Sequence, residues 1–222
     1  MTIALIAARS GSKRIKNKNI KIFCGKPIIY YSIKAAKDSK LFKEIIVTTD
    51  SNKISSVAHY FGAKIFLRSK KLSTDNVMLS PVIYDVLKKS KSEYACYIYA
   101  TAPLIKFRDI QNSYRKIKKY KADCCLAVTN YDFPVSRSLV KDNIYIKFKY
   151  PKWKNIPSQK TPKIFHDAGL FFWLNIKNFI KSKNLLPKKT IEYHINSNDA
   201  QDIDTISDWN LATYKFKKRN YK

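Results

Sequence analysis

The sequence contains little glycine and little cysteine, and each scarcity excludes a class of site. Only four glycines occur among 222 residues, and neither the P-loop pattern G-x-x-x-x-G-K-[ST] nor the dinucleotide fingerprint G-x-G-x-x-G is present. The four cysteines, Cys24, Cys96, Cys124 and Cys125, show no C-x-x-C spacing and no histidine at zinc-ligand spacing. We therefore expect buried, reduced thiols in a cytoplasmic protein.

Long apolar runs are also absent. The first apolar stretch ends at Arg9 after a few residues, and basic residues follow it instead of preceding it, which is the wrong order for a signal peptide. No window approaches the ~20 apolar residues of a membrane span, so we expect no membrane segment. With 45% hydrophobic and 14% aromatic residues, the chain can still fill the core of one sizeable α/β domain.

Acidic residues are the third scarcity. The sequence has 16 Asp and Glu against 44 Lys and Arg, which gives a formal net charge of +28. Such a surface can bind nucleic-acid backbones by counterion release. The lysines, however, are spread from Lys13 to Lys222 and accompany an excess of Ile, Asn and Tyr, as in a coding bias towards A/T-rich codons. Without a recognisable binding module, the charge does not favour nucleic acid as the partner.

Apolar runs of strand length alternate with segments of helical periodicity along the first part of the chain. The expected strands are 2–7, 44–50, 63–68, 93–101 and 123–129, and the expected helices are 27–40, 51–62, 77–90 and 107–120. This alternation predicts an α/β fold with a Rossmann-like, doubly wound and mostly parallel sheet. Ligands of such sheets bind outside the carboxyl ends of the strands, so residues just after each strand are candidates for a site.

The pattern changes after Thr129. We expect residues 131–163 to form an insertion in a single domain that spans 1–222. An alternating stretch beside a polar turn indicates a small β-hairpin that leaves the main sheet, and a proline-rich loop then leads back to the core through HDAGLFFWL. The tail 215–222 is predicted to be a frayed, basic end.

The segment AARSGSKRIKNKN, residues 7–19, directly follows the first expected strand. Gly11 allows a tight turn with close approach of the backbone to a ligand. Four cations of this loop are candidate partners for phosphate oxygens: Arg9, Lys13, Arg14 and Lys18. The residues alone leave two interpretations, a binding loop for a phosphate chain and an ordinary basic surface turn.

Polar residues follow later strands as well. Arg68 and Asp75 come after the third expected strand, and QDIDT, residues 201–205, lies near the carboxyl end. In an extended segment, Asp202 and Asp204 place both carboxylates on one face. Such a pair suits a hard divalent cation such as Mg²⁺ beside a polyphosphate. The alternative is that Asp204 caps the helix expected at ISDWNLA, and the two interpretations are compatible.

In this order, the motifs AARSGSKRIKNKN, IIVTTD, LRSKKLSTD and DIDT resemble the cytidylyltransferases that activate nonulosonic acids, the family of the sialic acid synthetases. The resemblance covers nearly the whole chain. Three further stretches, YATAPLI, FPVSR and FHDAGLFFW, are similar to the pseudaminic acid branch of that family. The resemblance to this family implies a nucleotidyltransferase. In its reaction, the anomeric hydroxyl of the sugar acid attacks the α-phosphate of CTP, giving a CMP-sugar and pyrophosphate.

The resemblance also implies roles for residues at matching positions. The nucleotide-binding positions correspond to Arg9, Ser10, Gly11, Ser12, Lys13, Lys18, Asn19, Arg68 and Asp75. Lys18, Asp202 and Asp204 are the expected catalytic residues: Lys18 for charge on the α-phosphate, and the two aspartates as ligands of Mg²⁺. The proton acceptor is left open between a carboxylate and a metal-bound hydroxide. Ser10 and Arg14 stand where the family loop more often has glycine.

The sugar acid is expected between the core and the insertion. Candidate residues there are Tyr99, Thr101, Phe133, Arg137, His166 and Asp167. Arg137 is expected to pair with the sugar carboxylate, whereas His166 is equally compatible with an ordinary structural histidine. Members of the family generally pair through the insertion, so the resemblance implies a homodimer.

Other functions stay open at this point. Activation of N-acetylneuraminic or legionaminic acid would use the same nucleotide residues and differ only in the acceptor pocket. Activation of 3-deoxy-octulosonate is disfavoured, because that group carries a different acidic motif after the fourth strand. From other classes, a basic nucleic-acid-binding protein would show salt-sensitive binding without triphosphate dependence. A catalytically idle, sugar-binding relative would not need Lys18, Asp202 and Asp204.

Overall fold

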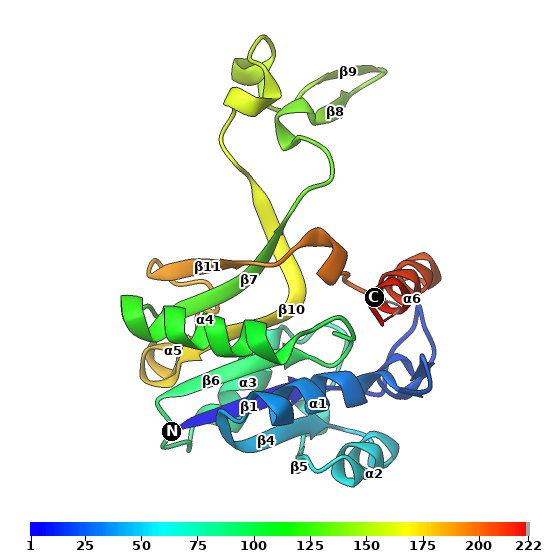
Figure 1. The fold of residues 1–222 in the computed structure, drawn as a ribbon, viewed down its shortest axis with the longest axis vertical. Helices are drawn as coiled ribbons and strands as arrows, with labels where there is room; N and C mark the ends of the chain where they lie inside the picture. The colour runs from blue at the N-terminus through cyan, green and yellow to red at the C-terminus, as the bar shows by residue number, and fades with distance from the viewer. Residues whose placement is uncertain (221–222) are drawn as a thin grey trace.

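A twisted central sheet with helices on both faces forms the body of the protein, and an arm projects from it (Figure 1). The computed structural model describes residues 1–220. The strands of the main sheet are β1 (Thr2–Ala7), β4 (Phe42–Thr49), β5 (Lys64–Leu67), β6 (Tyr94–Tyr99), β7 (Cys124–Asn130), β10 (Phe165–Asn175) and β11 (Thr190–His194). Their order is β11-β7-β10-β6-β1-β4-β5. β10 runs antiparallel to β6 and β7, and the other pairings are parallel, which confirms the predicted sheet.

The helices form a layer on each face of this sheet. They are α1 (Ile28–Ser39), α2 (Asn52–Tyr60), α3 (Leu79–Leu87), α4 (Phe107–Tyr120), α5 (Ile176–Ser182) and α6 (Ile206–Asn220). α1 contacts α4 on one face, and α3 contacts α5 on the other. The doubly wound architecture predicted from the alternation of strands and helices is therefore present.

Strand β1 shows how the sequence produces this arrangement. Ala4 and Ile6 join one buried cluster with side chains of α1 and α4, whereas Ile3 and Leu5 join a second cluster with side chains of α3 and α5. Successive side chains of a strand point to opposite faces, so a strand covered on both sides requires an unbroken apolar run. The run TIALIA meets this requirement, and its buried strand carries the loop that follows at its carboxyl end.

The arm consists of residues between β7 and β10, and it contains the predicted hairpin. Strands β8 (Leu139–Asp142) and β9 (Tyr145–Phe148) pair antiparallel. Asn143 in the connecting turn has φ +57°, a left-handed conformation that asparagine tolerates better than most residues. Figure 1 shows the arm beyond the extended ends of β7 and β10, away from the helical layers.

The prediction of a frayed tail over 215–222 is wrong as far as residue 220, and residues 221 and 222 lie outside the described part of the chain. This segment continues α6. Phe216 and Trp209 of that helix pack against the Phe23 ring, with centroid distances of 5.5 and 5.3 Å. The aromatic contacts fix the helix to the strand-end loop region. They join residues that are distant in sequence, and the basic composition of the tail does not indicate them.

The cysteines are free, and one of them is not buried as expected. Cys24 is exposed, because it lies with Gly25 in the tight turn between β2 (Ile22–Phe23) and β3 (Lys26–Pro27), where both residues have positive φ. The other three, Cys96, Cys124 and Cys125, are buried. Sequence patterns did not predict α5 and β11. Within residues 1–220, none of the helices combines the length and apolarity needed to cross a membrane.

Candidate active site

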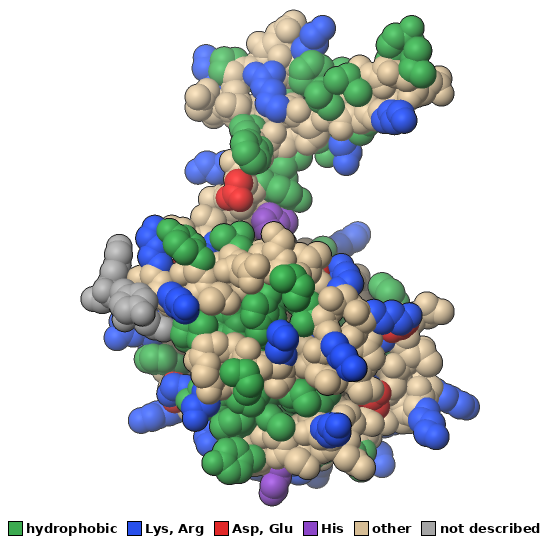
Figure 2. Space-filling model, turned by 90° about the vertical axis from the view of Figure 1, so that its right-hand side faces the viewer, with side chains coloured by type: hydrophobic (Ala, Val, Ile, Leu, Met, Phe, Trp, Pro, Cys, Tyr) green, Lys and Arg blue, Asp and Glu red, His purple; other side chains and the backbone are tan. Residues whose placement is uncertain are grey.

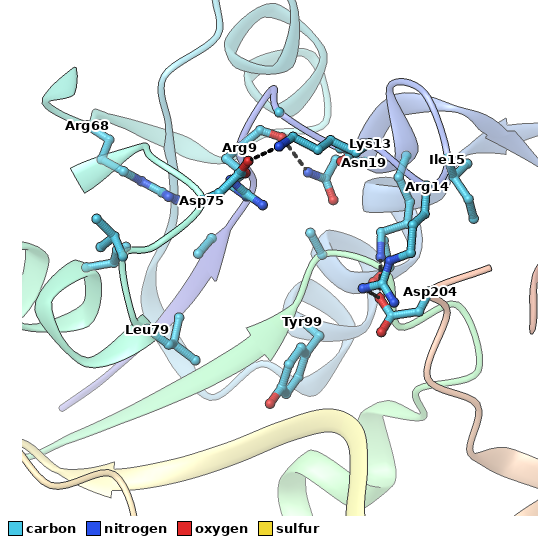
Figure 3. Close-up of a pocket in the computed structure, with 18 of the residues that line it drawn as sticks. Arg9, Lys13, Arg14, Ile15, Asn19, Arg68, Asp75, Leu79, Tyr99 and Asp204 are labelled. Carbon is cyan, nitrogen blue, oxygen red and sulfur yellow. Dashed lines mark hydrogen bonds and ion pairs between the residues drawn. The ribbon is translucent and has the colours of Figure 1, made fainter. Parts of the chain in front are cut away.

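A cavity of about 490 Å³ lies at the carboxyl ends of β1 and β6 (Figure 3). The predicted nucleotide residues that line it are Arg9, Gly11, Ser12, Lys13, Lys18, Asn19, Arg68 and Asp75. Tyr99, Thr101 and Asp204 line it too. Segments far apart in the sequence thus meet at the strand ends, where the fold predicted a ligand site.

Ser10 is the one predicted nucleotide residue that does not line this cavity. Its backbone N–H donates to Asp50 Oδ1 and its hydroxyl donates to Asp50 Oδ2, each at 2.8 Å. Asp50 follows β4 at the neighbouring strand end. These two bonds tie the loop to the adjacent strand, and a positioning role for Ser10 explains why the side chain faces away from the cavity.

The loop after β1 is held from both sides. Ile15 is 3% exposed and packs in a cluster with Phe23 and Trp209. Asn19 is also buried, and its Nδ2 donates to the Arg9 carbonyl at 2.9 Å. These contacts anchor the middle and end of the loop, so its charged side chains project into the cavity from a fixed backbone.

Two of the loop cations pair with Asp75 across the cavity. Arg9 and Lys13 each form an ion pair with its carboxylate. The hydrogen bonds from Lys13 and Arg9 hold the pKa of the Asp75 carboxyl below its usual range. A carboxylate repels phosphate, so Asp75 acts in this state as the counter-ion of the loop.

The other two loop cations pair with Asp204. Arg14 Nη2 lies 3.0 Å and Lys18 Nζ 3.3 Å from the same oxygen, Asp204 Oδ1. Lys18 also donates to the carbonyl of Ile203 and is only 19% exposed. Figure 3 shows Arg14 and Asp204 facing each other at one side of the cavity.

Arg68 forms part of the cavity wall. It is 9% exposed, and its Nη2 donates to the Thr48 carbonyl at 2.9 Å. Burial lowers the pKa of its guanidinium, an effect that the charge of Asp50 opposes. Among the described residues its Nε has no hydrogen-bond partner. A buried, incompletely paired guanidinium is a strong attraction for an anionic group.

A second cavity of about 360 Å³ adjoins the first through Asp204, which lines both. Asp202 and His166 line the second cavity only. Burial raises the pKa of the Asp202 carboxyl, and the charge of Asp204 raises it further. Asp204 therefore stands at the junction of the two cavities, and Asp202 lies on the side of the second.

The interpretation of Asp204 as the helix cap is wrong. Helix α6 begins at Ile206, and Thr205 Oγ1 accepts from the Asp208 N–H at 3.2 Å while Asp208 Oδ2 accepts from the Thr205 N–H at 2.7 Å. This reciprocal pattern is a capping box with Thr205 as the N-cap. The carboxylate of Asp204 is thereby free to face the cavity.

Asp202 and Asp204 offer carboxylate oxygens of the kind that Mg²⁺ takes when it binds together with a substrate. Within residues 1–220, no three His, Cys, Asp or Glu side chains form a complete metal cluster. A Cβ at Gly169, which has φ +65°, would lie 3.1 Å from Asp202 Cβ, so a glycine makes room for this carboxylate. Two carboxylates leave most Mg²⁺ ligand positions to phosphate and water oxygens, which is the usual mode of Mg²⁺ at nucleotide sites.

Tyr99 and Asp167 support this corner of the site. Tyr99 Oη donates to Asp167 Oδ2 at 3.1 Å, and Asp167 Oδ1 accepts from the Gly169 N–H at 2.8 Å. Burial raises the pKa of the Tyr99 phenol and the Asp167 charge raises it further, which keeps the phenol a donor. The register of β10 against β7 shifts between Asp167 and Phe172, and this irregularity brings Gly169 against Asp202.

The remaining sugar-site candidates are dispersed. His166 lines the second cavity, and its ring lies 4.7 Å from that of Tyr131 between centroids. Phe133 lines a separate hollow in the arm. Arg137 donates to the carbonyls of Lys154 and Ile156 at 2.7 and 2.9 Å. Phe133 and Arg137 are thus not brought to the strand-end cavity within one chain, and the sugar-binding roles stay predictions.

Arg14, one of the four loop cations named as candidate partners for phosphate oxygens, also lines the first cavity, although the resemblance gave it no role. Sequence analysis missed the apolar wall of that cavity: Val77, Leu79, Val82 and Tyr97. Three of these lie at or near the start of α3. Apolar residue types at the start of a helix do not indicate that a residue lines a cavity.

Comparisons with known proteins agree with this geometry. The model of a family described as Cytidylyltransferase matches residues 3–165. The chain is 33% identical to the pseudaminic acid cytidylyltransferase of Campylobacter jejuni, over 97% of this chain and 96% of that protein. It is 30% identical to a CMP-N,N'-diacetyllegionaminic acid synthase of Legionella pneumophila, over 95% and 94%. An N-acylneuraminate cytidylyltransferase of Escherichia coli is 29% identical, over 98% of this chain and 52% of that protein.

Solved structures resemble the chain in fold. A CMP:2-keto-3-deoxy-manno-octonic acid synthetase complexed with CTP has a TM-score of 0.74 at 14% identity, covering 98% of this chain and 99% of that one. A 4-diphosphocytidyl-2C-methyl-D-erythritol synthase from Anaerococcus prevotii has a TM-score of 0.69 at 13% identity, covering 97% and 96%. The nucleotidyltransferase fold predicted from the sequence is therefore confirmed. Together with the family match over most of the chain, it shows that this protein is a nucleotidyltransferase of the cytidylyltransferase family.

Proposed function

We propose that the protein activates pseudaminic acid: CTP and pseudaminic acid give CMP-pseudaminic acid and pyrophosphate. The observation that carries this proposal is the pair of adjoining cavities that share Asp204. The larger cavity has a cationic loop and a buried Arg68 suited to a triphosphate, and the smaller one offers space for an acceptor. Asp204 stands between the two, and Asp202 lines the smaller one.

The chemistry asks the protein mainly for positioning and charge neutralisation. Lys18, held by the Ile203 carbonyl, is proposed to neutralise charge on the α-phosphate, and the more exposed loop cations to hold the other phosphates. Bound at Asp202 and Asp204, Mg²⁺ would supply further neutralisation and lower the pKa of the attacking hydroxyl. The hydrogen bonds of Tyr99 and Asp167 are proposed to hold the segment beside Asp202 in place for the acceptor, the sugar acid.

The choice of sugar acid rests on two lines of support. Pseudaminic acid cytidylyltransferases of two Campylobacter jejuni strains match nearly the whole chain at 33% and 32% identity. The stretches YATAPLI, FPVSR and FHDAGLFFW resemble the same branch. Activation of legionaminic or N-acetylneuraminic acid is the second candidate, because relatives named for those substrates match at 30% and 29% identity.

We also propose that the protein is a homodimer joined through the arm. Large apolar side chains of β8, β9 and their connecting turn are exposed, among them Ile144, Tyr145 and Ile146. A second copy of this chain would cover them and bring its own arm residues near a strand-end cavity. A cytoplasmic location is proposed from the four free cysteines, since disulfides are rare in reducing compartments.

Pyrophosphate release tests the proposed function. The purified protein is incubated with CTP and Mg²⁺ and, in parallel, with pseudaminic, legionaminic or N-acetylneuraminic acid, and Lys18→Ala serves as the inactive control. Release with pseudaminic acid alone is expected. Release with another acid alone would keep the chemistry and overturn the sugar, and no release from folded protein with any of the three would overturn the proposal.

A further inference from the structure

The four cations of the loop after β1 that line the cavity are all paired with carboxylates of the chain. Arg9 and Lys13 pair with Asp75, and Arg14 and Lys18 pair with Asp204. The loop cations are thus paired with two carboxylates, and bound phosphate oxygens would replace these carboxylates as their partners. Binding a triphosphate therefore requires an exchange of partners, in which the carboxylates are released.

The exchange has different consequences for the two carboxylates. Asp75 belongs only to the larger cavity, whereas Asp204 lines both cavities and is a proposed Mg²⁺ ligand. Its Oδ1 receives both Arg14 and Lys18. A divalent cation and a guanidinium compete for one carboxylate oxygen because both are positively charged. While it is paired with Asp204, Arg14 is a competitor of the metal.

Arg14 and Lys18 differ in how readily they can leave Asp204. Lys18 is 19% exposed and is also held by the Ile203 carbonyl. Arg14 is 65% exposed, and Asp204 is its only hydrogen-bond or ion-pair partner among the described residues. Its long side chain can turn from Asp204 towards phosphate oxygens in the same cavity, where guanidinium groups bind in a bidentate manner.

We propose that Arg14 couples nucleotide binding to metal binding by exchanging Asp204 for the triphosphate. Without nucleotide, Arg14 neutralises Asp204 and disfavours the metal. With nucleotide, Arg14 moves to the phosphates, Lys18 turns to the α-phosphate as proposed above, and Asp204 Oδ1 is left to the divalent cation. Arg14 acts through Asp204 and is a positioning residue. The inference rests on the proposed function, since it takes the ligands to be a nucleoside triphosphate and a divalent cation.

The test measures Mn²⁺ binding to the nucleotide-free protein by electron paramagnetic resonance. Arg14→Ala is expected to tighten Mn²⁺ binding about fivefold, because it removes a partly exposed ion pair that competes with the metal. Lys16→Ala is the matched control: Lys16 is exposed in the same loop and does not line the cavity. Its effect is expected to stay below about twofold, since exposed charges are screened.

A second measurement determines how strongly Mn²⁺ changes the affinity for CTP. CTP affinity is determined by calorimetry in EDTA and in Mn²⁺, and the ratio of the two affinities is compared between variants. Arg14→Ala is expected to reduce this ratio about fivefold, because coupling is reciprocal. A merely structural role of Arg14 would weaken metal binding instead of tightening it.

The outcomes separate this inference from the proposed function. Tighter Mn²⁺ binding and a reduced ratio for Arg14→Ala, with Lys16→Ala close to wild type, support the exchange. If wild-type protein binds CTP and Mn²⁺ but Arg14→Ala behaves like Lys16→Ala, the exchange is overturned and the proposed function stands. If wild-type protein binds neither ligand, the proposed function is overturned and the exchange with it.

Discussion

The strand-end cavity and the arm use their side chains in opposite ways. In the cavity, each loop cation has a carboxylate partner within the chain, and the loop that carries them is anchored by buried Ile15 and Asn19. On the arm, apolar side chains point outward, with Phe133 and Ile144 each 84% exposed. Figure 2 shows hydrophobic side chains gathered on the arm above the body of the protein.

This difference distinguishes the cavity, whose loop cations are paired within one chain, from the arm, whose apolar surface is left uncovered. The proposed nucleotide half of the site is assembled from strand ends of a single chain. The arm exposes apolar surface that monomeric proteins rarely keep, and its Arg137 is already bonded to carbonyls of the arm itself. Substitutions in the cavity should therefore change the chemistry, and substitutions on the arm should change the assembly.

The largest effect is expected for Asp202→Asn. Loss of one carboxylate beside the reacting groups should reduce turnover by about 10³-fold, as for other removals of an electrostatic catalytic group. The same variant should be more stable than wild type at pH 7. Burial raises the pKa of Asp202 in the folded state, so this carboxyl lowers the stability of wild type as the pH rises above the unfolded pKa, and the full cost is reached above the folded pKa. Turnover assays and thermal unfolding check the two results.

The pH dependence of that stability difference is the control. Below the unfolded pKa of about 3.9, the carboxyl is protonated in both states, so the advantage of Asp202→Asn should disappear. An advantage that persists unchanged at low pH, or a variant that is less stable at pH 7, would contradict burial of the Asp202 charge as the cause.

The second prediction concerns the arm. The double substitution Ile144→Asp and Ile146→Asp should weaken the proposed dimer at least about 100-fold, because it places charges in the proposed apolar interface. Sedimentation velocity measures the change. Ile22→Asp is the matched control, since Ile22 is a comparably exposed isoleucine, at 61%, on the body of the protein. A dimer that survives the arm substitutions, or one that the control disrupts, would contradict the assignment of the interface.

The third prediction concerns Gly169 in the β10 irregularity. Gly169→Ala should lower the unfolding free energy by about 1–2 kcal/mol, because a Cβ is strained at φ +65°, and it should also weaken Mn²⁺ binding by pressing on Asp202. Gly25→Ala provides the comparison. Gly25 has φ +91°, but a Cβ there would meet nothing within 4 Å. It should lose stability and bind Mn²⁺ normally, and equal Mn²⁺ affinities in both variants would contradict the contact.

The smallest effect is expected for Tyr99→Phe. Removing its hydrogen bond to Asp167 should cost about 1 kcal/mol, seen as a rise in the KM for the sugar acid that is larger than any change in the KM for CTP. Tyr97→Phe is the control, because the Tyr97 hydroxyl makes no hydrogen bond among the described residues. An increase in the KM for CTP alone would mean that Tyr99 serves the nucleotide.

The parts of the fold that sequence analysis predicted are those coded by contiguous residues. The run TIALIA forms β1 within its predicted bounds, and the loop after it lines the predicted site, because strand-end placement follows from parallel topology. What was missed depends on long-range contacts. Arg137 bonds with backbone carbonyls of Lys154 and Ile156, which no side-chain pattern indicates.

The cap of α6 illustrates the same limit at short range. Asp204, Thr205 and Asp208 are all acceptable capping residues, and only the geometry shows that Thr205 and Asp208 form the box. Ser10 is a similar case, because its bonds to Asp50 come from the adjacent strand end. Residue types located the site, but the direction of each side chain depended on partners distant in sequence.

Calorimetric titration of CTP in Mg²⁺ measures whether one chain completes the nucleotide site without the arm. Wild type is compared with the arm double variant and with Lys18→Ala. We expect the arm variant to bind CTP within about twofold of wild type, because distant sites act independently, and Lys18→Ala to lose most of the affinity. Loss of CTP binding in the arm variant, with binding retained in Lys18→Ala, would show instead that the nucleotide site depends on the arm and not on the loop after β1.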